Sequence, residues 1–274
     1  MKILLSTDME GCAGILNHDD WVIPQGRFYL QGRRILTEET NAAVAGFFEA
    51  GATAVTVIDG HGAGGIDPEL LDERAELCRG PHPLGYLGEL DGSYAALAFV
   101  GQHAKAGTPR SHITHTGWFN WIDESINGIS VGEYGQSALV AMELGVPTIF
   151  AAGEEALAKE AQALTPGVVT VAVKRGLQDD DGMIGLDTDG YRAAKLGAVH
   201  LAPARARQLI RQGACQAIRQ LNRDPGSFGY PAIKPPYVRL ARFRRKGDAP
   251  GFTARDTHPS SLRALVNMPY TPVQ

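Results

Sequence analysis

The 274-residue chain carries 26 Lys and Arg against 30 Asp and Glu, a formal net charge of −4, with 44% hydrophobic and 20% charged residues. This composition is that of a globular protein, so it excludes a disordered or collagen-like chain and gives little support to a nucleic-acid partner. Because the three cysteines, Cys12, Cys78 and Cys215, have no paired spacing and no apolar run reaches membrane-spanning length, we expect a cytoplasmic protein with no membrane partner.

Apolar runs alternate with helical patterns, which predicts an α/β fold with a mainly parallel sheet flanked by helices. The expected strands, in chain order, are Lys2–Thr7, Thr53–Asp59, Ala95–Gly101, Val146–Gly153 and Val168–Lys174. Apolar residues recur at helical spacing from Leu36 to Phe47, and Gly51 supplies the stop of this helix. A further helix is expected over Glu133–Leu144, leading into the fourth strand.

The last third of the chain differs in pattern from the rest. Asp179–Gly190 is acidic and contains glycine, which indicates an exposed loop. A helix is expected over Pro203–Leu221, and beyond it only Val238–Phe243 has the pattern of a strand. We therefore predict an α/β catalytic domain over residues 1–200 and a smaller α+β subdomain over 201–274, with a role in oligomerisation.

Side chains of metal-ligand type follow three of the expected strands. Asp8 and Glu10 follow the first strand, His61 the second and His103 the third, and Glu133 begins a helix. The carboxyl ends of parallel strands share one edge, where ligands bind in open α/β sheets. Each residue alone has a structural explanation, as a cap or a hydrogen-bonded buried histidine. Together, carboxylates and imidazoles suit Zn²⁺, and five such ligands suffice for two tetrahedral ions if one carboxylate bridges.

Two other patterns compete with this metal site. Gly60, Gly62 and Gly65 satisfy G-x-G-x-x-G after a strand, but no strand ending in an acid follows at the distance a dinucleotide site requires. H-E-x-x-H does not occur, which argues against a one-zinc protease of that type, and none of the three cysteines stands next to a motif histidine, which argues against cysteine catalysis. The basic run Arg239–Lys246 could contact RNA, but a solvated strand edge or hairpin is the favoured interpretation.

Several ordered segments resemble one known family, the DppA-like D-aminopeptidases, which are binuclear zinc metallopeptidases. These segments are Ser6–Gly11, Gly32–Gly62, Val100–Pro109, Thr114–Thr116 and Ile126–Glu155. The resemblance covers most of Met1–Lys174 and implies two zinc ions per chain. It implies Asp8 as the bridging ligand, Glu10 and His61 as the other ligands of one ion, and His103 and Glu133 as those of the second.

The resemblance also implies a catalytic residue and an assembly. His115, flanked by threonines, falls at the family's catalytic histidine, although the preceding segment is one residue longer than the family pattern and contains His112 as an alternative. The loop Gly60–Asp67 lacks polar residues that the family has there. The family forms ring-shaped homo-oligomers, decamers in the best-matching type, so a homodecamer with its active sites facing an internal channel is expected.

The resulting expectation is a metal-dependent aminopeptidase that hydrolyses short peptides or amides with a free N-terminus and, in particular, those containing D-Ala. His115 would either stabilise the tetrahedral intermediate or protonate the leaving amine, and the sequence does not separate these roles. Two alternatives stay open: a binuclear metal hydrolase of another amide or of a phosphoester, and a non-catalytic metal-binding assembly protein. The preference for D- over L-residues is also open.

Overall fold

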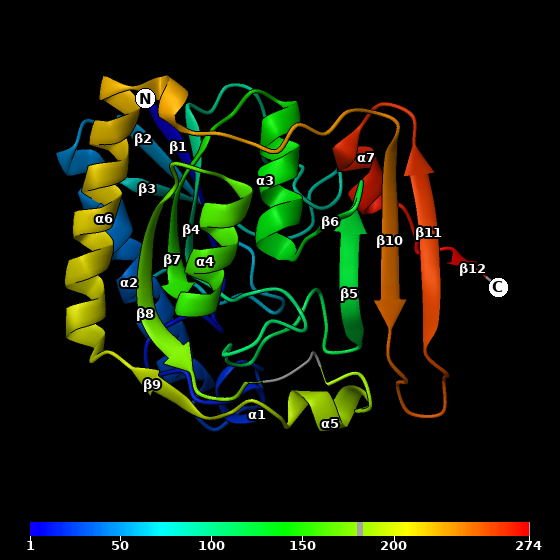
Figure 1. Ribbon diagram of the computed structural model, residues 1–274. Helices are drawn as coiled ribbons and strands as arrows, with labels where there is room; N and C mark the ends of the chain where they lie inside the picture. Colours follow the sequence, from blue (N-terminus) through cyan, green and yellow to red (C-terminus); the bar gives the residue numbers. More distant parts are fainter. Residues whose placement is uncertain (180–182, 274) are drawn as a thin grey trace.

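The computed structural model describes residues 1–179 and 183–273, and its main element is a seven-stranded sheet (Figure 1). The strand order is β3-β2-β1-β4-β7-β8-β9. All neighbouring strands pair in parallel except the last pair, β8 with β9. The strands are β1 (Lys2–Thr7), β2 (Ala54–Asp59), β3 (Ala75–Cys78), β4 (Ala96–Gln102), β7 (Thr148–Glu154), β8 (Val169–Gly176) and β9 (Ala198–His200). The prediction of a mainly parallel sheet is confirmed.

Helices cover both faces of this sheet, because the central strands are apolar on both sides. One face packs on α2 (Tyr29–Glu49) and α6 (Pro203–Arg223), and the other on α3 (Glu133–Glu143) and α4 (Glu155–Leu164) (Figure 1). Successive residues of β1 point to opposite faces. Ile3 and Leu5 belong to the hydrophobic core under α2 and α6, and Leu4 belongs to the core under α3 and α4. The four helices include the three predicted from the sequence, each within a few residues except that α2 begins at Tyr29.

The chain order of the strands creates a switch point at the centre of the sheet. From β1 the chain builds outward through β2 and β3, and then returns to place β4 on the other side of β1. At such a point the two connections leave in opposite directions and open a crevice beyond the carboxyl ends of the strands. Asp8, His61 and His103 all lie just past these ends.

A second, five-stranded antiparallel sheet stands beside α3, at the right of Figure 1. Its order is β12-β11-β10-β5-β6, with β5 (Trp121–Ile126), β6 (Ile129–Ser130), β10 (Tyr237–Phe243), β11 (Phe252–His258) and β12 (Pro272–Val273). The expectation that Val238–Phe243 is the only strand of the C-terminal part was therefore wrong. β11 escaped the sequence pattern because its buried positions are Ala254 and Asp256, which do not give an apolar alternation.

The basic run Arg239–Lys246 forms most of β10 and the turn toward β11, so it is a hairpin as favoured. It is less solvated than expected, because Arg239 is fully buried and its guanidinium lies 2.7 Å from Asp256 of the paired strand. The division of the chain at residue 200 stays a prediction. The five-stranded sheet takes strands from both sides of that boundary, and α6, which follows the boundary, packs on the seven-stranded sheet.

The remaining elements are short. They are α1 (His18–Trp21), α5 (Thr188–Arg192), the 3-10 helix Pro225–Ser227 and α7 (Leu262–Asn267). The predicted loop 179–190 includes 180–182, which lie outside the described residues, and its end was wrong, because α5 begins at Thr188 with Asp187 as its N-cap. Within the described ranges no helix is both long and apolar enough to cross a membrane.

Candidate metal centre

The segments that leave β1 and β4 approach each other so closely that only glycine fits between them. The N–H of Gly11 donates to the carbonyl of Gly101 over 2.7 Å. A Cβ on Gly101 would lie 1.8 Å from the carbonyl oxygen of Asp8, and one on Gly11 would lie 2.1 Å from that of Gln102. Gly101 also has a φ of +73°, which an L side chain rarely adopts. This contact brings Asp8 and His103, the residue after Gln102, close together.

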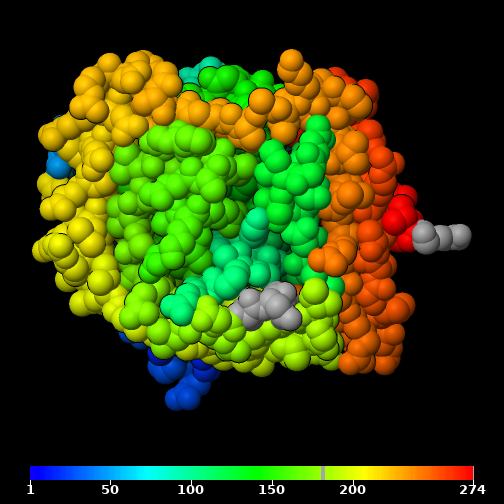
Figure 2. Space-filling view, viewed as in Figure 1, coloured from blue at the N-terminus to red at the C-terminus, as the bar shows by residue number. Residues whose placement is uncertain are grey.

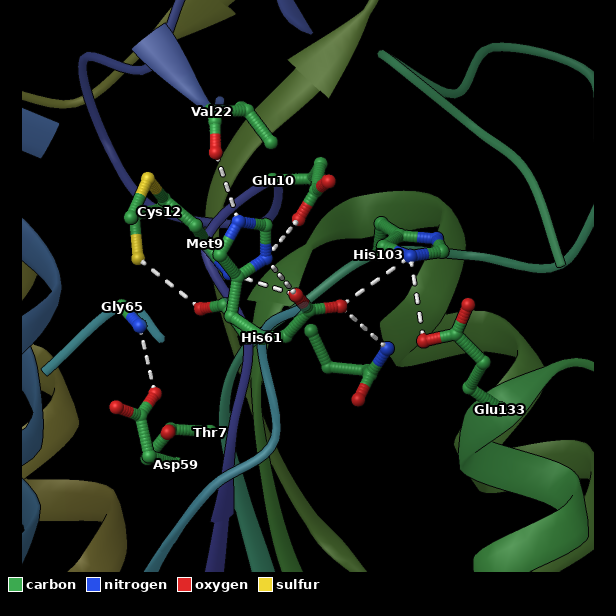
Figure 3. Close-up of polar contacts among 12 residues, drawn as sticks. Thr7, Met9, Glu10, Cys12, Val22, Asp59, His61, Gly65, His103 and Glu133 are labelled. Carbon is green, nitrogen blue, oxygen red and sulfur yellow. Dashed lines mark hydrogen bonds and ion pairs between the residues drawn. The ribbon is translucent and has the colours of Figure 1, made fainter. Parts of the chain in front are cut away.

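Asp8 lies between two imidazoles and faces each with a different oxygen. Its Oδ1 lies 3.1 Å from His61 Nδ1, and its Oδ2 lies 3.2 Å from His103 Nε2. A second carboxylate stands beside each ring, Glu10 at 3.4 Å from His61 Nδ1 and Glu133 at 3.6 Å from His103 Nε2 (Figure 3). The five predicted ligands thus form two adjoining groups that share Asp8.

Backbone carbonyls fix which nitrogen of each ring faces the carboxylates. His61 Nε2 lies 2.9 Å from the carbonyl of Val22, and His103 Nδ1 lies 2.8 Å from that of Ala104. A carbonyl only accepts, so these nitrogens carry the protons. The other nitrogen of each ring faces the oxygens of Asp8, where it can donate a proton to them or, once deprotonated, direct its lone pair at a metal ion.

The electrostatics of the cluster favour positive charge beside these carboxylates. Burial by itself would raise the pKa of Asp8 and of Glu133, but His103 holds the first far below its usual range and the second at about 2. Burial would lower the pKa of His61 and His103, but Glu10 with Asp8 raises the pKa of His61, and Glu133 with Asp8 that of His103, well above the usual value, so both rings carry a positive charge when no metal replaces their second proton. The buried carboxylates therefore stay ionised and attract positive charge.

The donor set fits a pair of zinc ions. Glu10 Oε2 and His103 Nε2 are buried without a hydrogen-bond partner, as expected of atoms that serve as ligands. Potential ligand atoms gather in two sets of three residues, and within each set these atoms lie within 4.8 Å of one another. One set is Asp8, Glu10 and His103, and the other is His103, Glu133 and His115. Imidazole and carboxylate ligands of this number are those of zinc hydrolase sites.

His115 lies at the cluster with its ring fully oriented. Its Nδ1 donates to the carbonyl of Ile113 over 2.9 Å, and its Nε2 lies 3.9 Å from Glu10 Oε1 and 4.0 Å from Glu133 Oε1. The ring stacks on His103 with centroids 4.1 Å apart. Burial, with the charge of His103, lowers the pKa of His115, so the ring is neutral and presents an unprotonated Nε2.

His112, the alternative in the same segment, points elsewhere. Its Nε2 lies 3.2 Å from the carbonyl of Leu16 and its Nδ1 lies 3.0 Å from the ammonium of Lys174. Neither contact involves a carboxylate of the cluster. Of the two histidines, the structure brings only His115 to the predicted ligands.

The cluster lies at the floor of a cleft of about 710 Å³. Aromatic side chains form part of its wall, among them Trp118, Trp121 and Tyr270. A separate cavity of about 600 Å³ opens between α4 and β6 and contains none of the predicted ligands. Figure 2 shows it as a hollow on the face of the molecule where α4 and β5 stand apart.

Sequence reasoning missed three polar residues that contact the cluster or its supporting segments. Gln102 ends β4 and donates from its amide to Asp8 Oδ2 over 3.1 Å. Glu154 ends β7, and Lys174 lies near the end of β8; both are buried. The available signal was the same for all three, a polar residue that closes an apolar strand run at the edge where ligands bind.

The glycine pattern Gly60, Gly62, Gly65 does not form a dinucleotide site. The stretch 60–74, described throughout, contains no helix, whereas that motif requires one whose N-terminus meets the phosphates. Instead, Asp59 accepts from the N–H of Gly65 over 2.7 Å and folds the loop back on itself (Figure 3). This loop carries His61 to the cluster.

Comparisons with known proteins agree on one family. A family profile described as D-aminopeptidase matches residues 1–184. A D-aminopeptidase of Bacillus subtilis (strain 168) is 39% identical over 178 residues, and the match spans 64% of this chain and 64% of that protein. A solved structure, described as the Zn-dependent D-aminopeptidase DppA from Bacillus subtilis, a self-compartmentalizing protease, superposes with a TM-score of 0.80 at 30% identity. That superposition covers 96% of this chain and 94% of the other.

Proposed function

The chain belongs to the D-aminopeptidase family, and on that premise we propose that it is a zinc-dependent aminopeptidase. Its substrates are short peptides or amides with a free N-terminus, those that begin with a D-residue such as D-Ala in particular. The observation that carries this proposal is Asp8, whose two oxygens lie 3.1 and 3.2 Å from the nitrogens of His61 and His103 that are not bonded to a backbone carbonyl. A carboxylate in this position suits a bridge between two ions.

In this proposal Asp8 would hold both ions, Glu10 and His61 would hold one of them, and His103 and Glu133 would hold the other. When bound, the pair supplies Lewis-acid polarisation of the scissile carbonyl and lowers the pKa of a water molecule. Glu133 is the most open of the ligand side chains, 24% exposed against 9% or less for the others, so the substrate reaches the cluster from its side.

His115 performs the proton transfer. Because its Nδ1 is held by Ile113, its Nε2 is left to accept the proton that the attacking water molecule loses and to give that proton to the leaving amine. The lowered pKa of the ring keeps it unprotonated near neutral pH, which is the state a general base requires. His115 therefore acts as a base first and as an acid second.

The assembly and the compartment are parts of the same proposal. The structural relative is described as self-compartmentalizing, and we propose a ring-shaped homo-oligomer, a decamer, for this chain also. The three cysteines are unpaired, which suits the reducing cytoplasm. In such a ring the cleft would open toward an enclosed space and admit only short or unfolded peptides.

The test compares paired D-alanyl and L-alanyl amides and peptides, beside a phosphoester, on protein of measured zinc content. The proposal expects about two zinc ions per chain, hydrolysis of the D-alanyl substrates, and loss of that activity on chelation with recovery on zinc addition. Hydrolysis of the phosphoester with no amidase activity would replace it with the other binuclear chemistry. Absence of any turnover by zinc-loaded protein would favour the non-catalytic alternative.

A further inference from the structure

Two buried charged side chains stand behind the metal cluster, at the ends of β7 and β8. Glu154 is fully buried and Lys174 nearly so. Neither contacts the cleft, and the proposed reaction uses neither of them. A buried charge costs free energy unless its partners offset that cost, so the partners of both side chains indicate their role.

The carboxylate of Glu154 joins two segments that carry site histidines. Its Oε1 accepts from the N–H of Ala104 over 2.8 Å, and its Oε2 accepts from the N–H of His112 over 2.7 Å. Ala104 follows the predicted ligand His103 directly, and His112 lies three residues before His115. One side chain therefore fixes the distance between the two segments whose rings stack.

The ammonium of Lys174 adds the third segment. It donates to the carbonyl of Glu10, and to His112 Nδ1 over 3.0 Å. Burial, with the charge of Lys174, lowers the pKa of His112 to about 2, so this ring is neutral and its Nδ1 accepts the bond. The segments that bear Glu10, His103 and His115 are thus all bonded to Glu154 or Lys174.

The backbone between these contacts needs such support. Ile113 has a φ of +56°, a strained conformation for a β-branched residue, and Arg110 has a φ of +52°. Residues in such conformations persist only where surrounding contacts hold them. The bonds at His112 and at the carbonyl of Ile113 flank the strained position on both sides.

We propose, on the basis of the zinc aminopeptidase function above, that Glu154, Lys174 and His112 form a buried clamp that positions the site. The clamp sets His103 and His115 at their stacking distance and holds Glu10 beside them. Its members are positioning residues, because they act on the ligands through backbone groups and not on the substrate. His112 is thereby assigned to the clamp and not to the chemistry.

Glu160 offers a matched control. It is also a carboxylate behind the cluster, and its Oε2 accepts from the N–H of Lys105 over 2.9 Å, one residue beyond the contact of Glu154. Its Oε1 has no hydrogen-bond partner within the described part of the chain, so Glu160 does not bond to the His112 segment. Glu160→Gln therefore alters a similar carboxylate without breaking the link between the two segments.

The test begins with Glu154→Gln, which replaces one accepting oxygen by an NH₂ group that cannot accept. In metal-free protein, hydrogen exchange should accelerate in the 103–116 segment, and Glu160→Gln should leave that segment as in the wild type. In zinc-loaded protein, affinity for one of the two ions should fall about 10- to 100-fold, the usual cost of losing a contact that orients a ligand. When Co²⁺ replaces zinc, the visible absorption of the Co²⁺ at that site should shift. The kcat for hydrolysis of a D-alanyl amide should fall, while KM changes little.

A merely structural role predicts a different pattern, a lower Tm with unchanged Co²⁺ absorption, unchanged zinc affinity and unchanged kcat in the folded fraction. That result would overturn the clamp, as would equal effects of Glu154→Gln and Glu160→Gln. Should Glu154→Gln not fold, Glu154→Asp keeps the charge but reaches at most one N–H, and the same readouts apply. Hydrogen exchange in the metal-free protein tests the clamp even if the wild-type protein does not bind zinc. The clamp and the zinc aminopeptidase function can therefore be refuted independently of each other.

Discussion

Replacement of His115 by Ala should abolish most of the activity without emptying the metal centre. The ring contributes Nε2, about 4 Å from the carboxylates of Glu10 and Glu133, while the five predicted ligands lie on other segments. Loss of a positioned general base or acid typically slows the chemical step by about 10²–10⁴, which corresponds to about 3–5 kcal/mol of transition-state stabilisation. Because the ring is buried and held through Nδ1, we expect the upper half of that range.

The pH profile carries the second part of this prediction. The pKa of His115 is lowered below its usual 6.5 by burial and by His103, and only the neutral ring accepts a proton. Wild-type kcat/KM should therefore fall as the pH drops through a value below 6.5, and His115→Ala should lose that acid limb. Added imidazole should restore part of the rate if it enters the space left by the ring.

Stopped-flow or steady-state hydrolysis of a D-alanyl amide, with zinc measured on the same samples, decides the outcome. His258→Ala is the control, since His258 lies on β11, away from the cluster, where its Nδ1 accepts from Ser261. A His115→Ala protein within about tenfold of wild-type activity, with both ions bound, would refute the assigned role. Loss of zinc together with activity would instead make His115 a ligand, as its place near His103 and Glu133 allows.

Three further predictions concern the metal, stability and assembly. Asp8→Asn should reduce the zinc content at both sites, because each oxygen of Asp8 faces a different histidine; elemental analysis that finds two ions would remove the bridge. Glu39→Gln should stabilise the protein at alkaline pH. Burial raises the pKa of Glu39 from 4.5 to about 7. Protonated Glu39 therefore contributes up to about 3 kcal/mol to the free energy of unfolding below pH 4.5, and this contribution is lost as the pH rises through 7. The amide oxygen of the introduced glutamine retains the acceptor for the N–H of Ala13, so urea unfolding should show a gain at about pH 8 and little change at about pH 4.5; equal shifts at both would contradict the titration. Light scattering should give the mass of a large ring, and a monomer at micromolar concentration would exclude enclosure of the site.

Much of the seven-stranded sheet and its helices could be predicted from the sequence. The strands Lys2–Thr7 and Ala96–Gln102 are continuous apolar runs because both of their faces are buried under helices, and such runs stand out in any local window. The predicted ligands could be placed at one edge for the same reason, since the ends of parallel strands lie together whatever their order. Neither inference needed a contact between distant residues.

The second sheet depended on contacts that no local pattern reveals. β5 carries Glu124, which is fully buried and accepts from Gln136 over 2.7 Å and from Tyr270, also over 2.7 Å. Arg239 is likewise buried because Asp256 faces it from the next strand. In a sequence, charged residues at these positions indicate exposure, because their neutralising partners are remote along the chain.

The sequence by itself determined the set of ligand types and the edge of the sheet on which they gather. Tertiary structure decided which oxygen of Asp8 faces which ring, and which nitrogen of each ring faces Asp8, because carbonyls of Val22 and Ala104 fix the rings. It also separated His115 from His112, three residues apart, since Lys174 and Leu16 engage one while Ile113 orients the other toward the cluster. Side-chain direction at this scale follows from hydrogen bonds between segments distant in sequence, and residue type and spacing do not encode those partners.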